Sequence, residues 1–372
     1  MSANRTILIM AAGTGGHIMP GLAIARELAS RGWRIHWMGT PKGMENRLVA
    51  QAGYPMVTVN MTGVRGKGAL AWLLLPTRLL ASFWQATVAI FRIRPDVVLS
   101  MGGYVAFPGG LMASFWRKPL VVHEPGAVAG ITNRALAMLA DRVIVGMDGA
   151  FERRVAQRWA NRLPKPRRID ALGTPVREDI ASVPPPESRY AGREGPLRLL
   201  VVGGSLGAQT MNDLVLAALA AIGAGERPRV VHQSGEKLYE GLRDAYAKAG
   251  VEAEIVPFVT DMAARYSWCD VLICRSGAIT VAEIAAAGVA AILFPLPWFV
   301  TEEQAANAAY LAERDAGIAM KQLETTPETL AGVLRGLTRD RLRAIAQAAR
   351  RLGKPDATRR CADLCAELAH AA

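Results

Sequence analysis

Short apolar runs alternate with longer amphipathic stretches along most of the chain. Runs rich in Val, Ile and Leu are typical of buried strands, and the stretches between them place apolar residues at helical spacing. The expected strands are 7–10, 34–38, 97–99, 120–123 and 142–145 in the first half, and 199–202, 230–233, 254–256, 271–274 and 291–294 in the second. This alternation predicts an α/β protein whose parallel sheets carry helices on both faces.

The length of the chain indicates two domains. Its 372 residues exceed the size of a typical single core, and half of them are hydrophobic, as in globular proteins. A stretch rich in proline and charge runs from 163 to 186, and we place the domain junction there. The expected domains are 1–172 and 173–345, both Rossmann-like. The helical segment 346–372 is expected to pack back on the first domain.

Four of the expected strands run into glycine-rich turns that open helical patterns. The turns are 13–17, 101–110, 203–208 and 275–280. Such a turn exposes backbone N–H groups beside the positive end of a helix dipole, which makes it a site for anions, usually phosphate. Ligands of open parallel sheets bind beyond the carboxyl ends of the strands. All four turns are therefore expected to line one deep cleft between the domains.

His17 follows the first turn, at or near a helix start. A helix N-terminus disfavours the imidazolium form, so the ring is expected to be neutral and able to accept a proton as a general base. The alternative is a histidine that only caps or packs at the turn. Its place between phosphate-binding turns favours the functional interpretation.

The net charge and the cysteine content limit which ligands, metals and partner molecules are expected. The net charge of +12 indicates anionic ligands or surfaces. Zinc-finger, aromatic RNA-binding and basic-zipper patterns are absent, and we expect no nucleic-acid partner. The four cysteines form no C-x-x-C pair, no D-x-D metal motif follows a strand, and no signal peptide is recognisable. We therefore expect reduced thiols, no protein-bound metal and no required cofactor.

Two other enzyme classes contain glycine-rich turns of similar sequence and must be considered as alternatives. A dinucleotide-binding oxidoreductase needs G-x-G-x-x-G, but Ile18 stands at the last position and no acidic residue follows the second strand. A serine hydrolase is the stronger rival, because 203–207 reads G-x-S-x-G between a strand and a helix. That reading requires a later histidine, and His232 falls inside an expected strand while His370 falls in the C-terminal tail. We assign the Ser205 hydroxyl to phosphate instead.

Polar residues in the second half have two interpretations each. Thr280 and Glu283 fit a capping box, in which the pair satisfies the free amides of a helix start. Glu283 can equally bind the two hydroxyls of a ribose. Gln304 and Asn307 have the i, i+3 spacing and the amide chemistry that recognise sugar hydroxyls, but a solvated helix face explains them as well.

The segment 68–94 is apolar and rich in tryptophan, with basic flanks. Pro76, Arg78 and Gln85 interrupt it, which argues against a membrane-spanning helix. It fits an interfacial helix on an anionic membrane, and an ordinary buried helix is the alternative. The expected membrane patch consists of Trp72, Leu75, Leu79, Phe83, Trp84 and Trp116.

Taken in order, these motifs resemble the MurG family of glycosyltransferases of peptidoglycan synthesis. The resemblance spans nearly the whole chain and is specific because the motifs follow one another in the family's order. The segments that carry it are 13–17, 20–23, 101–104, 108–110, 123–124, 175–177, 203–208, 275–283 and 304–307.

The resemblance implies a two-domain GT-B fold and an inverting transfer. N-acetylglucosamine would move from UDP-N-acetylglucosamine to the C4 hydroxyl of undecaprenyl-diphosphate-muramoyl-pentapeptide, converting lipid I to lipid II. The implied partners are the UDP-sugar, the lipid acceptor and an anionic membrane surface, with other cell-wall synthesis proteins as further candidates. The implied location is the cytoplasmic face of the inner membrane, as a peripheral protein.

The resemblance also implies roles for single residues. Arg177 and Ser205 would contact the donor diphosphate, Val259 and Ile279 the uracil, Glu283 the ribose, and Gln304 and Asn307 the transferred sugar. Further implied donor contacts are Thr14, Gly15, Gly16, Gly204, Ala278 and Thr280. The acceptor diphosphate would be bound by Gly13, Gly15, Gly102, Gly103 and Tyr104. His17 and Glu124 are the catalytic candidates.

The chain departs from the family pattern at several positions. Pro125-Gly126 replaces the usual Gln-Asn, Thr174 replaces Asn, Leu206 replaces Gln, and Glu303 stands where Gln is frequent. These changes affect individual site assignments more than the function. A UDP-sugar epimerase on the same fold, the serine hydrolase and a non-enzymatic membrane-binding module are the remaining alternatives.

Overall fold

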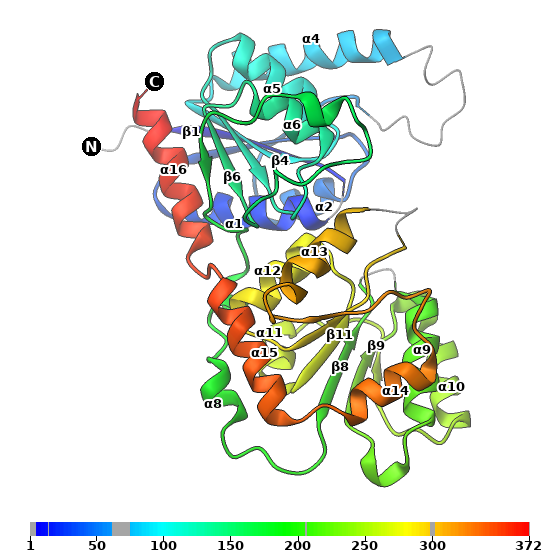
Figure 1. The fold of residues 1–372 in the computed structure, drawn as a ribbon. Helices are drawn as coiled ribbons and strands as arrows, with labels where there is room; N and C mark the ends of the chain where they lie inside the picture. The colour runs from blue at the N-terminus through cyan, green and yellow to red at the C-terminus, as the bar shows by residue number, and fades with distance from the viewer. Residues whose placement is uncertain (1–4, 14, 62–74, 205–206, 298–301, 372) are drawn as a thin grey trace. The chain divides into compact units, whose positions relative to one another are not determined.

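The computed structural model describes residues 5–13, 15–61, 75–204, 207–297 and 302–371 (Figure 1). The chain divides into two compact units, Met1–Arg177 with Asp356–Ala372, and Glu178–Pro355. The sequence placed the boundaries at 172/173 and 345/346. The second of these falls inside α15 (Arg339–Leu352), whose Leu342 and Ala346 are buried in the core of the second unit. Residues 346–355 therefore belong to that unit.

The first unit is built on one parallel sheet. Within its described residues the strand order is β3-β2-β1-β4-β5-β6-β7, and every pair is parallel. The strands are β1 (Thr6–Ala11), β2 (Arg34–Gly39), β3 (Met56–Thr58), β4 (Val97–Gly102), β5 (Leu120–Glu124), β6 (Arg142–Val145) and β7 (Ile169–Asp170). The order reverses between β1 and β4, which is where doubly wound sheets bind ligands.

Helices cover both faces of this sheet (Figure 1). One face carries α4 (Leu75–Ile93), α5 (Ala106–Phe115) and α6 (Ile131–Ala137). The opposite face carries α1 (Gly15–Ser30), α2 (Glu45–Gln51) and α16 (Ala357–Ala371). Cys361 and Cys365 of α16 are fully buried there, so the end of the chain completes the core of the first unit. A short 3-10 helix, η1 (Ala160–Arg162), follows β6.

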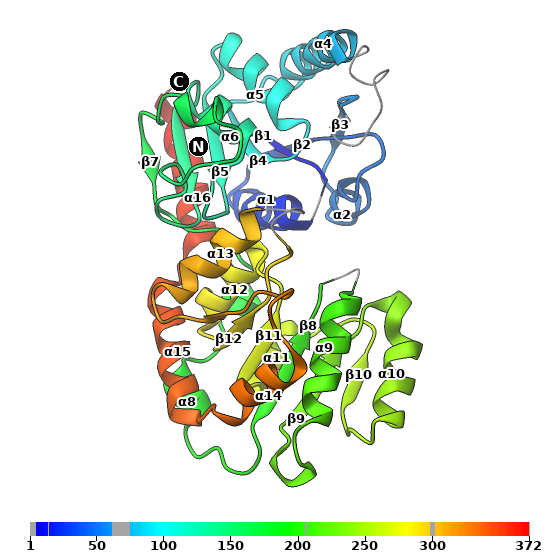
Figure 2. The same cartoon turned by 45° about the vertical axis from the view of Figure 1, so that its right-hand side comes forward.

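The second unit repeats this topology. Among its described residues the strand order is β10-β9-β8-β11-β12-β13, again all parallel (Figure 2). The strands are β8 (Arg198–Val202), β9 (Arg229–Gln233), β10 (Glu254–Val256), β11 (Val271–Cys274), β12 (Ala291–Leu293) and β13 (Ile318–Ala319). The predicted α/β class and the parallel sheets are confirmed. The short strands β3, β7 and β13 were not predicted.

The helices of the second unit pack in pairs as well as on the sheet. α9 packs against α14, and α15 packs against α12 and α8. Their bounds, with those of the remaining helices, are α7 (Glu178–Ala181), α8 (Pro186–Tyr190), α9 (Gln209–Ala220), η2 (Ala224–Glu226), η3 (Glu236–Leu238), α10 (Tyr239–Lys248), α11 (Met262–Trp268), α12 (Ala278–Ala287), α13 (Glu302–Ala312) and α14 (Pro327–Arg335).

A buried carboxylate holds several segments of the second unit together. Asp270 precedes β11 and is fully buried. It accepts hydrogen bonds from Arg193 Nη1 at 2.5 Å and from the backbone N–H of Arg198 at 3.0 Å. Because Arg193 also donates to the carbonyls of Cys269 and Ser267, the guanidinium fixes the chain around the start of β11.

Removing this carboxylate is expected to destabilise the second unit strongly. Asp270→Ala leaves the largely buried guanidinium of Arg193 without its counter-charge, which costs about 3–5 kcal/mol. The exposed pair Arg243–Glu240 is the control, and Glu240→Ala should cost about 1 kcal/mol or less. Urea unfolding measures both variants. Equal losses in the two variants would contradict the role given to Asp270.

Candidate functional site

Glycine loops meet at the carboxyl edge of the first sheet. Gly102 ends β4 and Gly103 follows it, with φ of +113° and +88°, a backbone region that residues with side chains rarely adopt. A Cβ on Gly103 would lie 2.2 Å from the carbonyl oxygen of Ala12, and a Cβ on Gly102 would lie 2.7 Å from the His17 ring. The loops after β4 and β1 therefore contact each other through backbone atoms with no side chain between them. These loops are neighbours because β1 and β4 are adjacent in the sheet.

His17 lies in the first turn of α1, against Gly102. Burial lowers the pKa of its imidazole, and a hydrogen bond with the backbone of Met101 opposes this shift. Nδ1 is buried and has no hydrogen-bond partner among the described residues. The ring is therefore neutral near pH 7, with a nitrogen lone pair that can accept a proton.

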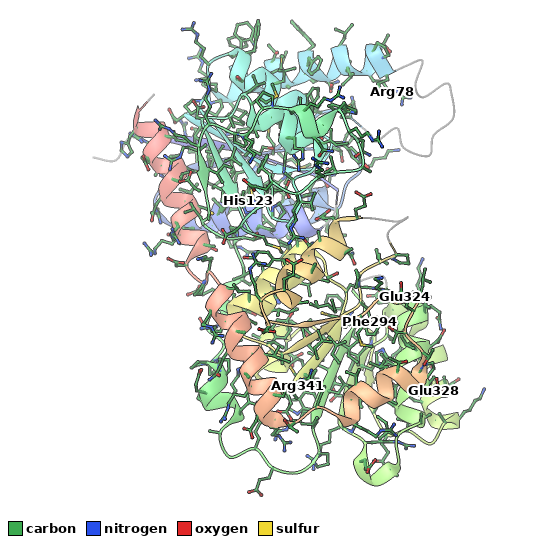
Figure 3. All side chains as sticks on the ribbon, in the orientation of Figure 1. Arg78, His123, Phe294, Glu324, Glu328 and Arg341 are labelled. Atoms are coloured by element: carbon green, nitrogen blue, oxygen red, sulfur yellow. The ribbon has the colours of Figure 1, made fainter. Side chains whose placement is uncertain are left out.

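His123 lies close to His17, inside the first unit (Figure 3). Burial lowers its pKa to about 4; the charge of His17 contributes to this lowering, and the hydrogen bond with the backbone of Gly173 opposes it. Its Nε2 donates to the carbonyl of Gly173 at 3.3 Å, which leaves Nδ1 as an acceptor.

Several buried polar atoms at this edge have no hydrogen-bond partner within the described ranges. They are His17 Nδ1, Ser100 Oγ, His123 Nδ1, Asn133 Oδ1 and Thr174 Oγ1. Buried polar groups are normally satisfied, and exceptions gather where ligands or water bind. Thr174 stands where the family has Asn, and Gly146 leaves room for its hydroxyl.

Glu45 was not predicted from the sequence. It begins α2, is fully buried, and accepts hydrogen bonds from the backbone N–H of Gly13 at 3.2 Å and of Thr40 at 2.8 Å. Its carboxylate thus ties the loop after β1 to the loop after β2. The N–H of Gly13, which was predicted to bind the acceptor diphosphate, is used inside the protein. Gly15 and Gly16 form the first residues of α1.

Glu124 ends β5 and is nearly fully buried. Its carboxylate accepts from the backbone N–H groups of Gly126 and Gly130, both at 3.0 Å, and from Asn133 Nδ2 at 2.9 Å. These bonds fold the loop between β5 and α6 around the carboxylate. The N–H of Gly126 is thus used inside the protein.

In the second unit, Gln233 joins two loops that were predicted separately. Its Nε2 donates to the carbonyl of Gly204 at 2.9 Å, and its Oε1 accepts from the N–H of Val259 at 3.2 Å. Gly207 has a φ of +76°, and a Cβ there would lie 2.4 Å from the carbonyl of Ser234. The turn after β8 is thus packed against the ends of β9 and β10.

The capping-box interpretation of Thr280 and Glu283 is wrong. α12 begins at Ala278 with Gly277 as its N-cap, so Thr280 lies inside the helix. The Glu283 carboxylate accepts from the hydroxyl of Tyr266 at 3.2 Å instead. Ala278, Ile279 and Thr280 form the first turn of α12, directly after β11.

Asn307 is fully buried in α13, so a solvated helix face is the wrong interpretation for it. Its Nδ2 donates to the carbonyl of Ser276 at 3.0 Å, and Ser276 Oγ donates to the carbonyl of Gln304 at 2.7 Å. Gln304 Oε1 accepts from the N–H of Leu296. The loops after β11 and β12 are held to one end of α13 by these bonds.

The rival serine-hydrolase interpretation finds no suitable histidine in the second unit. His232 is fully buried in β9, where its Nε2 donates to Asn212 Oδ1 at 3.1 Å and its Nδ1 accepts from the Tyr246 hydroxyl at 2.8 Å. Burial lowers its pKa to about 3. It is a core residue with both ring nitrogens in use.

Two residues of the predicted membrane patch, Trp84 and Trp116, are exposed on α4 and just after α5, and other apolar side chains are exposed beside them. α4 presents Leu80, Trp84, Val88 and Phe91 to solvent, and α5 ends on exposed Phe115 and Trp116. Leu75, Leu79 and Phe83 are only partly exposed, and Phe83 packs against Phe107. The buried-helix alternative does not hold, because α4 buries only the stripe of Ser82, Ala86, Ala89 and Ile90. Arg78, labelled in Figure 3, lies in the first turn of α4.

Other predicted residues are placed as follows. Tyr104 is exposed after β4, and Arg177 ends the first of the two segments that form the first unit. Thr14, Trp72, Ser205 and Leu206 lie outside the described residues. Within the described ranges, acidic, His and Cys side chains nowhere form a group able to hold a metal ion. None of the helices described there is sufficiently long and apolar to span a bilayer.

Comparison with known proteins identifies the family. Residues 7–145 match the glycosyltransferase family 28 N-terminal domain, and 198–361 match the C-terminal domain of that family. The chain is 53% identical over 371 residues, 99% of each chain, to a protein of Thiobacillus denitrificans named UDP-N-acetylglucosamine--N-acetylmuramyl-(pentapeptide) pyrophosphoryl-undecaprenol N-acetylglucosamine transferase. A protein of the same name from Aromatoleum aromaticum is 52% identical over 98% of each chain.

Solved structures agree with this result. The crystal structure of Acinetobacter baumannii MurG is 35% identical and covers 98% of this chain and 99% of its own, with a TM-score of 0.83. A UDP-N-acetylglucosamine 2-epimerase from Listeria monocytogenes shares the fold at 16% identity, with a TM-score of 0.64. The two parallel sheets therefore form a GT-B fold, and the chain belongs to glycosyltransferase family 28 and, within it, to the MurG transferases.

Proposed function

We propose that this protein transfers N-acetylglucosamine from UDP-N-acetylglucosamine to undecaprenyl-diphosphate-muramoyl-pentapeptide. The observation that carries the proposal is the 53% identity, over 99% of both chains, to a transferase named for this reaction. The two repeated sheets with glycine turns at their carboxyl edges support it, because the reaction joins two diphosphate-bearing substrates. The first unit binds the acceptor and the second binds the donor.

The transfer is a displacement at the anomeric carbon. The C4 hydroxyl of the acceptor attacks this carbon with inversion, the bond to the diphosphate breaks, and UDP leaves with the bonding electrons. The hydroxyl proton passes to His17, whose neutral ring is set by burial. Backbone amides at helix starts and Arg177 stabilise the charge that grows on the diphosphate. No protein-bound metal is assigned to this step.

The second unit supplies the donor contacts. We assign the diphosphate to Ser205 and the Gly204 turn, the uracil to Val259 and Ile279, and the ribose to Glu283. Gln304 and Asn307 bind the transferred sugar. The hydrogen bonds from Gln233 to Gly204 and Val259 support this assignment, because they hold the diphosphate and uracil loops in one arrangement.

Glu124 and Glu45 act as positioning residues. Each carboxylate is buried and accepts N–H groups from its own loops, which fixes the backbone around it. This arrangement supports a role for Glu124 in shaping the loop between β5 and α6, here called the acceptor loop, rather than in proton transfer. His17 then remains the proposed general base.

We also propose that the exposed apolar stripe of α4, with Phe115 and Trp116, rests on an anionic membrane. Aromatic side chains bordered by arginines are typical of interfacial helices. The protein would then work as a peripheral enzyme at the cytoplasmic face of the membrane that contains its lipid acceptor. Contacts with other cell-wall synthesis proteins are part of this proposal.

A transfer assay tests the reaction. Purified protein is given radiolabelled UDP-N-acetylglucosamine and a prenyl-diphosphate-muramoyl-pentapeptide acceptor, with and without a chelator. The expected result is label in the lipid product in both cases. Release of free N-acetylglucosamine or its epimer without lipid product would refute the proposal in favour of a hydrolase or an epimerase.

Replacing His17 is expected to slow turnover rather than weaken donor binding. His17→Ala should lower kcat by about 100-fold or more with the KM for the donor unchanged. Because burial lowers the pKa of His17 below that of an ordinary histidine, kcat/KM should fall only at a pH lower than an ordinary histidine would give, as the ring is protonated. His17→Ala should not show this fall in kcat/KM at low pH. His370→Gln is the control. Parallel losses of donor affinity and rate would remove His17 from the role of base.

Vesicle binding tests the surface of α4. Leu80 and Leu323 are both 69% exposed, but Leu323 lies in the second unit. Leu80→Ser with Trp84→Ser should reduce partition to phosphatidylglycerol vesicles at least about tenfold, since burying each apolar side chain contributes about 1.5–3 kcal/mol. Leu323→Ser should change nothing. Unaltered partition of the double variant in a flotation assay would show that α4 does not touch the membrane.

A further inference from the structure

A basic pocket of about 170 Å³ lies in the first unit between α6 and the segment that follows β6. Its wall includes the cations Arg134, Arg153, Arg154 and Lys165, one carboxylate, Glu152, and Asn161. Neither the motifs nor the donor and acceptor contacts proposed above use this pocket.

Arg134 forms the fixed part of the wall. It lies in α6, is 7% exposed, and donates to the carbonyls of Ala129 at 2.9 Å, Phe151 at 3.4 Å and Arg153 at 2.5 Å. All three acceptors are neutral, and burial lowers the pKa of the guanidinium. The charges of Glu124 and Glu152 oppose this lowering of the pKa. The pocket therefore contains a buried guanidinium that its hydrogen bonds to backbone carbonyls hold in one orientation.

The segment beside it adds further positive charge. Residues 153–168 contain seven arginines and lysines and no acidic residue. Glu152 pairs with Lys165 at 3.7 Å, and among the described residues Arg154, Arg158, Arg162, Arg167 and Arg168 form no ion pair. Gathering like charges is unfavourable unless an anion neutralises them, so the composition of the pocket indicates an anionic ligand.

The pocket is joined to the acceptor loop. The bond from Arg134 to Ala129 holds the loop between β5 and α6 from one side, and Asn133, the preceding residue, binds the Glu124 carboxylate from the other. The backbone N–H of Ala129 also donates to the carbonyl of Ala150 at 2.8 Å. A ligand that reaches from the acceptor loop past α6 would therefore arrive at Arg134 and its neighbours.

We propose that this pocket binds a carboxylate of the peptide carried by the acceptor. The inference rests on the proposed function, in which the acceptor bears a pentapeptide, and such a peptide ends in a carboxylate. Arginine presents a planar fork of N–H donors that matches a carboxylate, and Asn161 and Lys165 border the same space. The pocket thus makes acceptor recognition depend on the peptide as well as on the diphosphate.

Steady-state kinetics with three acceptors test this proposal. They carry the pentapeptide, the pentapeptide with an amidated C-terminus, or no peptide. Arg154→Ala with Lys165→Ala removes two exposed cations of the pocket, and Arg167→Ala with Arg168→Ala removes the same charge just outside it. The pocket variant should raise the KM for the pentapeptide acceptor at least tenfold, with kcat and the KM for UDP-N-acetylglucosamine unchanged. The control should match the wild type.

The other acceptors separate a carboxylate site from general electrostatics. The wild type should bind the amidated acceptor as weakly as the pocket variant binds the pentapeptide acceptor, and the peptide-free acceptor should show no difference between the proteins. An equal rise in KM for the peptide-free acceptor, an equal effect of the control variant, or a loss of vesicle partition would overturn the proposal.

Direct binding separates this inference from the proposed function. Calorimetric titration with the free pentapeptide requires no transfer reaction. Binding to the wild type that is lost in the pocket variant supports the pocket even if no acceptor is glycosylated. Absence of peptide binding to the wild type, or equal binding to both proteins, overturns it while leaving the transferase assay unaffected.

Discussion

The site in the first unit depends on the close approach of two backbone loops where β1 and β4 part. The carbonyl of Ala12 occupies the space that a side chain on Gly103 would need, and the His17 ring occupies the space beside Gly102. Positive φ angles at both glycines turn the chain away from β4 at this point. The contact places a neutral histidine at the carboxyl edge of the sheet, where the first helix begins.

Buried polar side chains then fix the loops that this contact brings together. Glu45 and Glu124 each collect backbone N–H groups in the first unit, and Gln233 and Asn307 join loops in the second. A satisfied buried polar group holds its partners in one geometry, since breaking any of these bonds leaves a desolvated atom. In both units, therefore, loops rich in glycine are held in place by buried polar side chains. This combination suits sites that must present amides to a diphosphate without rearrangement.

The periodicity of the sequence predicted most strands and all four glycine turns, because both are local features of the chain. It did not predict Glu45, whose partner Gly13 is 32 residues away, or the buried position of Asn307, which depends on Ser276 in another loop. Of the exposed stripe of α4, the sequence predicted only Trp84 for a related reason: an apolar helix shows its outward face only once Ala86, Ala89 and Ile90 are known to pack on the sheet. The capping box failed because α12 begins at Ala278, before the threonine.

The contact between the Gly103 and Ala12 backbones is tested most directly by comparing the turnover of the Gly103→Ala and Gly130→Ala variants. A methyl group on Gly103 meets the Ala12 carbonyl, whereas one on Gly130 meets no atom within 4 Å. Displacing the loop by the required distance should reduce kcat/KM for transfer about 100-fold while circular dichroism shows a folded protein. Gly130→Ala should retain the wild-type value. A folded Gly103→Ala enzyme with wild-type turnover would contradict the claim that this backbone contact builds the site.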